Sequence, residues 1–296
     1  MPPINLSKPL GWANFMSKEH KSPPEDDFKK ERERLAKDST VSEQYREGIG
    51  EGNYGKSTAY MPFFTPQEPH TYHAMASTTN SIEYHTLHDL IIDAFAYAHN
   101  IWRTQAYFTG LTVNGPVVVG SAGCLKGPDI EEWMNRYPGK AEKSGQNFEA
   151  WFKAASKGIG DCHQKYVDGV TVPSLPWYPA FSAYPLAVAP PMPNTPMPFV
   201  SCTSIHQEKM FHFDSIKKAI LSEMGSLRKE LKDKVDETMC ESVAKVISTG
   251  YMSWASTQQV INAMGSGSVP TFAPPAVPAG PVVNGSVLSS PGILSV

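Results

Sequence analysis

Apolar side chains recur at helical spacing in three separate stretches, and a long run without charge follows each one. The clearest stretch is Leu87–Trp102, whose apolar positions follow i, i+3, i+4, i+7 spacing for four turns. The second begins at Asn147, a good helix cap, and reaches Asp168. The third is the charged pattern from Asp214 to Lys245, and we expect its helix, Ile216–Val246, to be the longest of the three.

The charge-free runs cover residues 104–125, 169–207 and 246–296. The first alternates apolar and polar side chains as a strand does, and Asn114-Gly115 is a tight-turn signal. In the other two, prolines fix φ and bias the residues before them toward extended backbone. The pattern therefore predicts an α+β fold in which amphipathic helices are each followed by Pro/Gly-rich extended segments.

Short sequence echoes suggest that the same plan occurs more than once. Gly115-Pro-Val-Val-Val-Gly-Ser121 matches Gly280-Pro-Val-Val-Asn-Gly-Ser286. Internal similarity of this kind is the signature of repeated units. The echoes are imperfect and unevenly spaced, so a degenerate repeat and shared composition both remain open.

Composition narrows the class of protein. The 296 residues are 41% hydrophobic, enough for a substantial core. The net charge of −3 provides no electrostatic footprint for nucleic acid or an anionic membrane, so neither is expected as a partner. We expect no signal peptide and no membrane span. The four cysteines form no Cys-x-x-Cys pair, which favours reduced thiols and synthesis in a cytoplasm.

Charge and turn signals divide the chain into three expected parts. Residues 1–80 form an extended arm with a short charged helix and a Gly-rich connector. Residues 81–207 hold the first two helix-plus-extended modules. Residues 208–296 hold the long helix and a charge-free C-terminal arm. Apolar residues as abundant as those of 246–296 are atypical of a disordered linker, so we expect this arm to be buried, in its own fold or against a neighbouring chain.

Two patterns in the first third point to ligands. Gly50-Glu-Gly-Asn-Tyr-Gly55-Lys56-Ser57 has Walker spacing, but a charged helix precedes it and prolines follow it, so a flexible connector is the better interpretation. The other pattern is a set of histidines that would support a metal-dependent hydrolase. Without a His-Glu-x-x-His motif, we expect no metal and no cofactor. The four histidines are His70, His73, His85 and His88.

The Pro-rich stretch 172–199 offers a further alternative, an adaptor that recruits a partner through polyproline geometry. Such ligands usually carry a flanking basic residue, which is missing here, so a packed extended wall fits better. The sequence also lacks a Gly-x-Ser-x-Gly motif and a Cys–His catalytic signature. We therefore expect a protein without enzymatic activity.

One stretch resembles a known class. A helix carrying Trp254, followed by Met264-Gly-Ser-Gly-Ser-Val-Pro-Thr-Phe-Ala-Pro-Pro-Ala-Val-Pro-Ala-Gly-Pro-Val-Val-Asn-Gly, is similar to an arrangement in tail-associated virion proteins of long-tailed bacteriophages. The resemblance covers residues 239–296 and, faintly, 96–120. It implies a structural subunit of a tail, neck, baseplate or related contractile injection particle, located in the virion after synthesis in the host cytoplasm.

The pattern of charge agrees with that class, because obligate interfaces are depleted of charge. We expect a homo-oligomer within a larger assembly, in contact with itself and with other virion proteins. The residues expected at these interfaces are large apolar side chains in the Pro-rich segments and arms. They are Trp12, Phe15, Trp177, Phe181, Trp254, Phe272, Val282 and Val283.

Overall fold

The structure is a computed structural model that describes residues 68–142, 146–178, 181–182, 188–227, 234–269 and 279–295. Within these residues it contains helices and antiparallel sheets, which confirms the α+β class. The helices are α4 (Glu68–Gln105), α5 (Ile130–Asn135), α6 (Gln146–Asp168), α7 (Glu208–Phe211), α8 (Phe213–Leu227), α9 (Lys234–Thr257) and the 3-10 helices η3 (Pro138–Glu142) and η4 (Phe199–Ser201).

The strands follow the helices in the order that the charge-free runs predict. They are β1 (Tyr107–Phe108), β2 (Thr112–Asn114), β3 (Val117–Gly120), β4 (Leu125–Lys126), β5 (Val170–Pro176), β6 (Phe181–Ser182), β7 (Val188–Met192), β8 (Met197–Pro198), β9 (Thr203–Ser204), β10 (Gln259–Val260), β11 (Ala263–Ser268), β12 (Ala279–Gly280), β13 (Val283–Ser289) and β14 (Leu294–Ser295). None of the helices in these ranges is long and apolar enough to cross a membrane.

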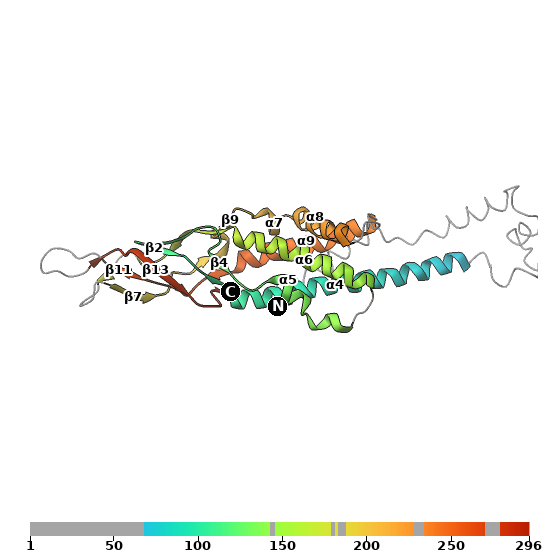
Figure 1. Cartoon of the computed structure of the whole chain (residues 1–296), viewed down its shortest axis with the longest axis horizontal. Helices are drawn as coiled ribbons and strands as arrows, with labels where there is room; N and C mark the ends of the chain where they lie inside the picture. Colours follow the sequence, from blue (N-terminus) through green and yellow to red (C-terminus); the bar gives the residue numbers. More distant parts are fainter. Residues whose placement is uncertain are drawn as a thin grey trace, which may run out of the picture. The chain divides into compact units, whose positions relative to one another are not determined.

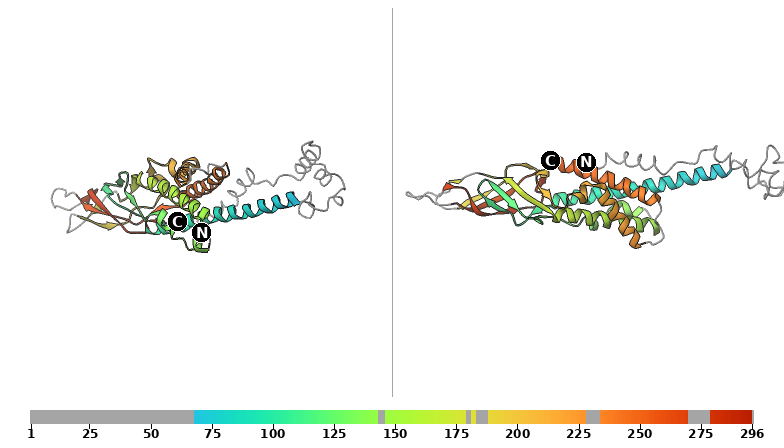
Figure 2. Two further views of the ribbon diagram at one scale, coloured as in Figure 1. Left: turned by 45° about the vertical axis from the view of Figure 1, so that its right-hand side comes forward. Right: turned by 90° about the horizontal axis from the view of Figure 1, so that it is seen from above.

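Backbone contacts group residues 87–296 in one compact unit and residues 14–86 in another. Helix α4 belongs to both, because its residues up to Thr86 lie in the second unit. In the larger unit the helices and the main sheet lie at opposite ends (Figures 1 and 2). The domain boundaries expected near residues 80 and 207 stay predictions, although strands from both sides of residue 207 meet in one sheet.

The helical end is built around the apolar faces of α4, α6, α8 and α9. On α4 the face predicted from sequence is buried, as Ile91, Phe95 and Trp102 show. Helix α6 packs closely on α8, because Gly158 lets the backbone of Ile220 approach without a side chain between them. Asp129 caps α5 by accepting a hydrogen bond from the Glu131 amide at 2.9 Å.

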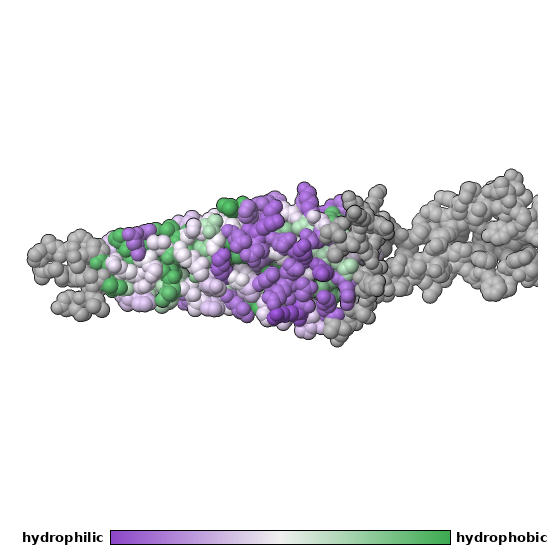
Figure 3. Space-filling view, viewed as in Figure 1, coloured by the Kyte–Doolittle hydropathy of each residue, from purple (hydrophilic) through white to green (hydrophobic). Residues whose placement is uncertain are grey.

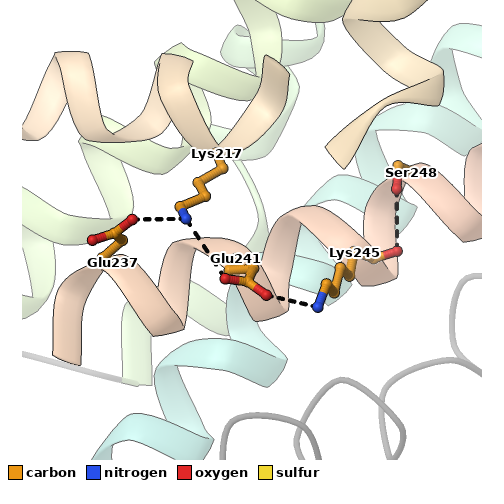
Figure 4. A network of polar contacts seen from close by, with 5 residues as sticks. All are labelled: Lys217, Glu237, Glu241, Lys245 and Ser248. Atoms are coloured by element: carbon orange, nitrogen blue, oxygen red, sulfur yellow. Dashed lines mark hydrogen bonds and ion pairs between the residues drawn. The ribbon is translucent and has the colours of Figure 1, made fainter. Parts of the chain in front are cut away.

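The prediction of a single helix over Ile216–Val246 is wrong. The two ends of this range belong to separate helices, α8 and α9, which pack against each other. Lys217 on α8 forms ion pairs with Glu237 at 2.8 Å and with Glu241 at 3.6 Å on α9 (Figure 4). In a straight helix, residues twenty positions apart would be separated by about 30 Å. The chain therefore turns back between the two helices, and their apolar faces meet each other.

The larger unit contains a seven-stranded sheet in the order β7-β11-β13-β2-β3-β5-β9, in which every neighbouring pair is antiparallel. All three charge-free runs contribute strands to it. The hairpin predicted at Asn114-Gly115 joins β2 to β3, and Gly115 takes the positive φ of +64° that this turn requires. Two-stranded pairs β1-β4 and β12-β6 and the three-stranded sheet β14-β10-β8 complete the strands.

The main sheet curls so that the ends of β5 and β7 approach each other. The Trp177 indole donates a hydrogen bond to the Met192 carbonyl at 3.1 Å, and the Thr195 amide donates to the Pro176 carbonyl at 3.0 Å. The concave face is filled by apolar side chains around three strand glycines. At Gly265 a Cβ would lie 2.7 Å from the Trp177 ring, so the glycine makes room for the indole.

The segment expected to be a C-terminal arm pairs with its own chain wherever the structure describes it. Strand β11 pairs with β7 and β13, and β13 pairs with β2, which belongs to the first charge-free run. Val269, Ile293 and Leu294 are buried. The expected burial is thus intramolecular in these strands. Residues 270–278 lie outside the described residues, as do residues 1–67 of the N-terminal arm expected over 1–80, whose residues 68–80 belong to helix α4.

Candidate assembly surface and a buried histidine cluster

The convex face of the main sheet is the first candidate site, because it is exposed and uncharged. Strand register aligns Val188, Ser268 and Val283 in one row across three strands. A second row contains Met264 and Leu288. Val188 and Val283 are each 51% exposed and Leu288 is 69% exposed. None of the residues in the seven strands, all of which are described, is charged.

A β-bulge places these apolar side chains on the same face. Ser266 pairs with Ser286 and Ser268 pairs with Val283, so two steps along β11 match three steps along β13. Asn284 lies in the bulge with a φ of +50°, a conformation that asparagine tolerates better than most residues. Without the extra residue, strand alternation would put Val283 and Leu288 on opposite faces. The bulge therefore joins them in one surface, called here the convex apolar face.

The edges of this sheet are poorly suited to pairing with another strand. Edge strand β7 contains Pro190 and Pro191, which lack the amide donor that a ladder needs. The opposite edge strand, β9, is only two residues long. Both devices are typical of sheets that avoid edge-to-edge association. Contact with a partner would therefore use the convex apolar face rather than an edge.

Charge is segregated toward the helical end of this unit. Figure 3 shows hydrophilic residues over the helices and pale or hydrophobic residues over the strands. The helical surface carries the ion pairs of Lys217 with Glu237 and Glu241, which continue from Glu241 to Lys245 (Figure 4). A soluble surface usually mixes charges of both signs over its whole extent. The sheet end departs from that rule.

Of the eight side chains expected at interfaces, the structure describes four. Trp177, Trp254 and Val282 are buried inside their own chain, so they offer no surface to a neighbour in this conformation. Val283 belongs to the convex apolar face, and its interface role stays a prediction. The β6 strand includes Phe181, but its side chain lies outside the described part of the chain, as do Trp12, Phe15 and Phe272 entirely.

The second candidate site is a buried cluster of rings where α4, α6 and α9 meet. Each helix contributes two rings spaced three residues apart near its C-terminal end. Ring centroids of His99 and Trp254 lie 4.3 Å apart, and those of His163 and Trp102 lie 4.8 Å apart. The pairs are His99 and Trp102 from α4, His163 and Tyr166 from α6, and Tyr251 and Trp254 from α9, and all six are buried.

Four polar atoms of this cluster lack a hydrogen-bond partner among the described residues. They are His99 Nε2, His163 Nε2, the Tyr251 hydroxyl and Trp254 Nε1. Buried polar atoms are usually paired, so four together mark an unusual core. Burial lowers the pKa of His163 to about 3. Burial, with added repulsion from His163 and Arg103, holds the pKa of His99 well below its usual range.

The histidines considered for metal lie on α4, but they do not form a metal cluster where side chains are described. His88 is buried and uses both ring nitrogens, with Nε2 at 3.2 Å from the Ser242 hydroxyl and Nδ1 at 3.0 Å from Asp89. His85 is exposed. Within the described residues, no group of three or more His, Cys, Asp or Glu side chains could hold a metal ion. The side chains of His70 and His73, and the Gly50–Ser57 loop, lie outside that part.

The Pro-rich stretch 172–199 and the cysteines have structural positions. Strands β5, β7 and β8 come from this stretch and pair within the chain, so these residues are not a free polyproline ligand. All four cysteines are buried and free in the structure, and their reduced state stays a prediction. Burial raises the pKa of Cys162 to about 11 and that of Cys202 to about 12, so both thiols stay neutral.

Sequence reasoning missed the histidine cluster, because it looked for histidines close together in the chain. His99 and His163 come from different helices and meet only in the fold. A usable signal was present: each of the three helices carries two rings at i and i+3 near its C-terminal end. Comparisons with known proteins add no assignment, since no family model, curated protein or solved structure matches this chain significantly.

Proposed function

We propose that this chain is a non-enzymatic structural subunit of a larger assembly and that its convex apolar face contacts a second copy of the chain. The observation that carries the proposal is the exposed, uncharged row of Val188, Ser268 and Val283, with Leu288 on the same face beyond the paired Ser266 and Ser286. Large exposed apolar patches on soluble proteins mark interaction sites. Interface cores are also depleted of charge.

A second copy is the favoured occupant because of charge complementarity. A partner seated on this face must itself lack charge there, or its charged groups would lose their hydration without compensation. The helical end of a neighbouring copy presents ion-paired lysines and glutamates such as Lys217 and Glu237 and does not meet that condition. The sheet end of a neighbouring copy does meet it. The same face on both partners gives an isologous contact with twofold symmetry.

The class of assembly follows from the resemblance to tail-associated virion proteins of long-tailed phages. A tail, neck or baseplate subunit must hold several neighbours and needs no chemistry of its own. The segregation of charge to one end of the larger unit and the blunted sheet edges support this role. Mass spectrometry of purified particles from the source of this sequence tests it: a stoichiometric virion component is expected, and absence from every particle would refute the assignment.

The contact itself is tested by placing charge on the convex apolar face. Leu288→Glu and Val283→Glu alter exposed side chains, so both variants should keep the circular dichroism and melting temperature of the wild type. Sedimentation velocity should show a dimer or larger oligomer for the wild type and a monomer for both variants, because two carboxylates would be buried in each isologous contact.

Met252→Glu is the matched control. Met252 is 49% exposed and apolar, but it lies on α9 rather than on the sheet. This variant should sediment like the wild type, which separates a specific surface from a general effect of added charge. A wild-type chain that stays monomeric at every concentration would contradict the proposed contact, as would folded Leu288→Glu protein that still forms the oligomer.

We also propose that the three helix-plus-strand modules are degenerate repeats. The support is the equivalent placement of the ring pairs, since His99, His163 and Tyr251 each stand three residues before a second ring on α4, α6 and α9. A charge-free, strand-forming run then follows each helix. Superposition of the three modules in an experimental structure tests this, and ring pairs that fall at different positions relative to the first following strand would count against duplication.

A further inference from the structure

The ring cluster joins three long helices through side chains that are polar and almost completely hidden. His99 lies edge-on to Trp254 with ring centroids 4.3 Å apart and to Tyr251 at 5.4 Å, both on α9. His163 on α6 lies 5.9 Å from Tyr251 and 6.3 Å from His99. The two imidazoles thus contact α9 at this level, beside direct contacts of Trp254 with Trp102 and of Tyr251 with Tyr166.

We propose that His99 and His163 form an acid-sensitive lock that holds α9 against α4 and α6 while both imidazoles are neutral. Protonation of either imidazole would place a positive charge among aromatic rings, with no anion beside it among the described residues. His99 stacks on Phe95 and Trp102 and lies edge-on to Trp254 and Tyr251. Attraction between a cation and these rings offsets only part of the lost hydration, because a cation–π contact contributes about 0.5–2 kcal/mol and burial of an unpaired charge costs considerably more.

Where the structure describes the chain, the groups around the imidazoles give no compensating negative charge. His163 and Arg103 both disfavour a positive charge on His99, and burial alone accounts for the behaviour of His163. The phenols that face the cluster stay neutral, because burial raises the pKa of both Tyr166 and Tyr251. The titratable groups acting on the cluster and its tyrosines are Arg103 from α4, His163 and Tyr166 from α6, Tyr251 from α9, and Cys202 after η4.

The direction of the pH effect follows from the lowered imidazole values. The unfolded chain binds protons at these histidines from pH 6.5 downward, whereas folded His163 does so only near pH 3. Stability from the neutral pair is thus complete above pH 6.5 and is lost as the pH falls toward 3. Each histidine should raise the unfolding equilibrium constant by about tenfold per pH unit within that window.

The lock has a defined place of opening. Helix α9 leads through β10 into β11, and β11 lies between β7 and β13 in the main sheet. As the pH falls, local opening at the cluster should therefore loosen α9 first. The strand ladder of the main sheet contains no histidine, so the sheet should open only at lower pH. The inference does not depend on the proposed assembly role, because the cluster lies inside a single chain.

The test follows unfolding of the full chain by denaturant between pH 7.5 and 5, above the range in which ordinary carboxyl groups titrate, at about pH 4. The unfolding constant should rise about a hundredfold per pH unit below 6.5 in the wild type and about tenfold in His163→Gln. His212→Gln, which alters an exposed histidine, should match the wild type. Equal slopes for His163→Gln and the wild type would overturn the proposal.

Two measurements on the unaltered protein keep the proposal testable if His163→Gln does not fold. Nitrogen NMR of labelled histidines should show His99 and His163 neutral in the folded chain at pH 5, and charged rings at that pH would overturn the lock. Hydrogen exchange, corrected for its intrinsic pH dependence, should accelerate in α9 before β11 and β13 as the pH falls. Simultaneous loss of protection in the helix and the sheet would overturn the local opening.

Discussion

Replacing Gly158 with alanine should destabilise the protein, although alanine is the better helix former. A Cβ built at Gly158 would lie 2.8 Å from the Ile220 nitrogen and 2.9 Å from the Ile220 Cα and the Ala219 carbonyl carbon. These are backbone atoms of α8, so they cannot rotate away as a flexible side chain could. They are roughly half an ångström closer than ordinary van der Waals contact.

Two opposing effects decide whether the protein gains or loses stability. Helix propensity favours alanine over glycine by about 1 kcal/mol. Overpacking of a tight contact costs about 1–3 kcal/mol, and α6 would have to move away from α8 along the interface. Because overpacking outweighs propensity, we expect a net loss of about 1 kcal/mol for Gly158→Ala and a greater loss for Gly158→Val. For a chain of this size the melting temperature should fall by roughly 2–4 °C per kcal/mol.

Urea unfolding followed by circular dichroism measures the change, with Lys153→Ala as the control. Lys153 is exposed on the same helix, so its replacement should leave the free energy of unfolding nearly unchanged. A Gly158→Ala variant more stable than the wild type by the full propensity difference would refute the close approach of α6 and α8. A loss that does not grow from alanine to valine would do the same.

Three further outcomes are expected. Deletion of residues 265–296 should abolish cooperative thermal unfolding, because it removes most of β11 and all of β13 from the sheet; a wild-type melting curve would contradict the strand order. Asn194→Ala should lower the free energy of unfolding in urea by about 3 kcal/mol, because the Asn194 side chain donates to the Thr195 and Val260 carbonyls and accepts from an amide. A change below about 1 kcal/mol would show that these hydrogen bonds are dispensable. A double-mutant cycle of Lys217→Ala and Glu241→Ala should give a coupling of about 1 kcal/mol that weakens with salt; a salt-independent coupling would exclude the ion pair as its source.

The features that sequence predicted are those set by local pattern. Apolar periodicity located α6 and the Leu87–Trp102 part of α4, because it depends only on residues a few turns apart. The Asn114-Gly115 signal predicted a hairpin because its turn needs a residue that accepts positive φ, which Gly115 provides. In each case the determining groups lie within a few helical turns or one hairpin of one another.

The features that sequence did not predict depend on partners far apart in the chain. The turn between α8 and α9 interrupts a charged pattern whose periodicity is the same on both sides, so periodicity carries no mark of the reversal. Gly158 of α6 serves a contact with α8 that only the fold reveals, because no local pattern marks where a second helix will approach. The meeting of His99 with His163 likewise depends on how helices pack. Strand order was equally hidden, because nothing in a run marks which other run its strands pair with.

The position of β13 between β11 and β2 has a consequence for how the protein is made. The Asn284 amide donates to the Asn114 side chain at 3.2 Å, across 170 residues of sequence. At ribosomal rates of about 5–20 residues per second, the β2–β3 hairpin is synthesised roughly 10–35 seconds before β13, which pairs with β2. During that interval the uncharged edge of β2 is unpaired and can pair with a strand of another chain. Cells that produce this chain in quantity should therefore show a dependence of yield on chaperones that shield nascent apolar strands, and slower translation should increase that dependence.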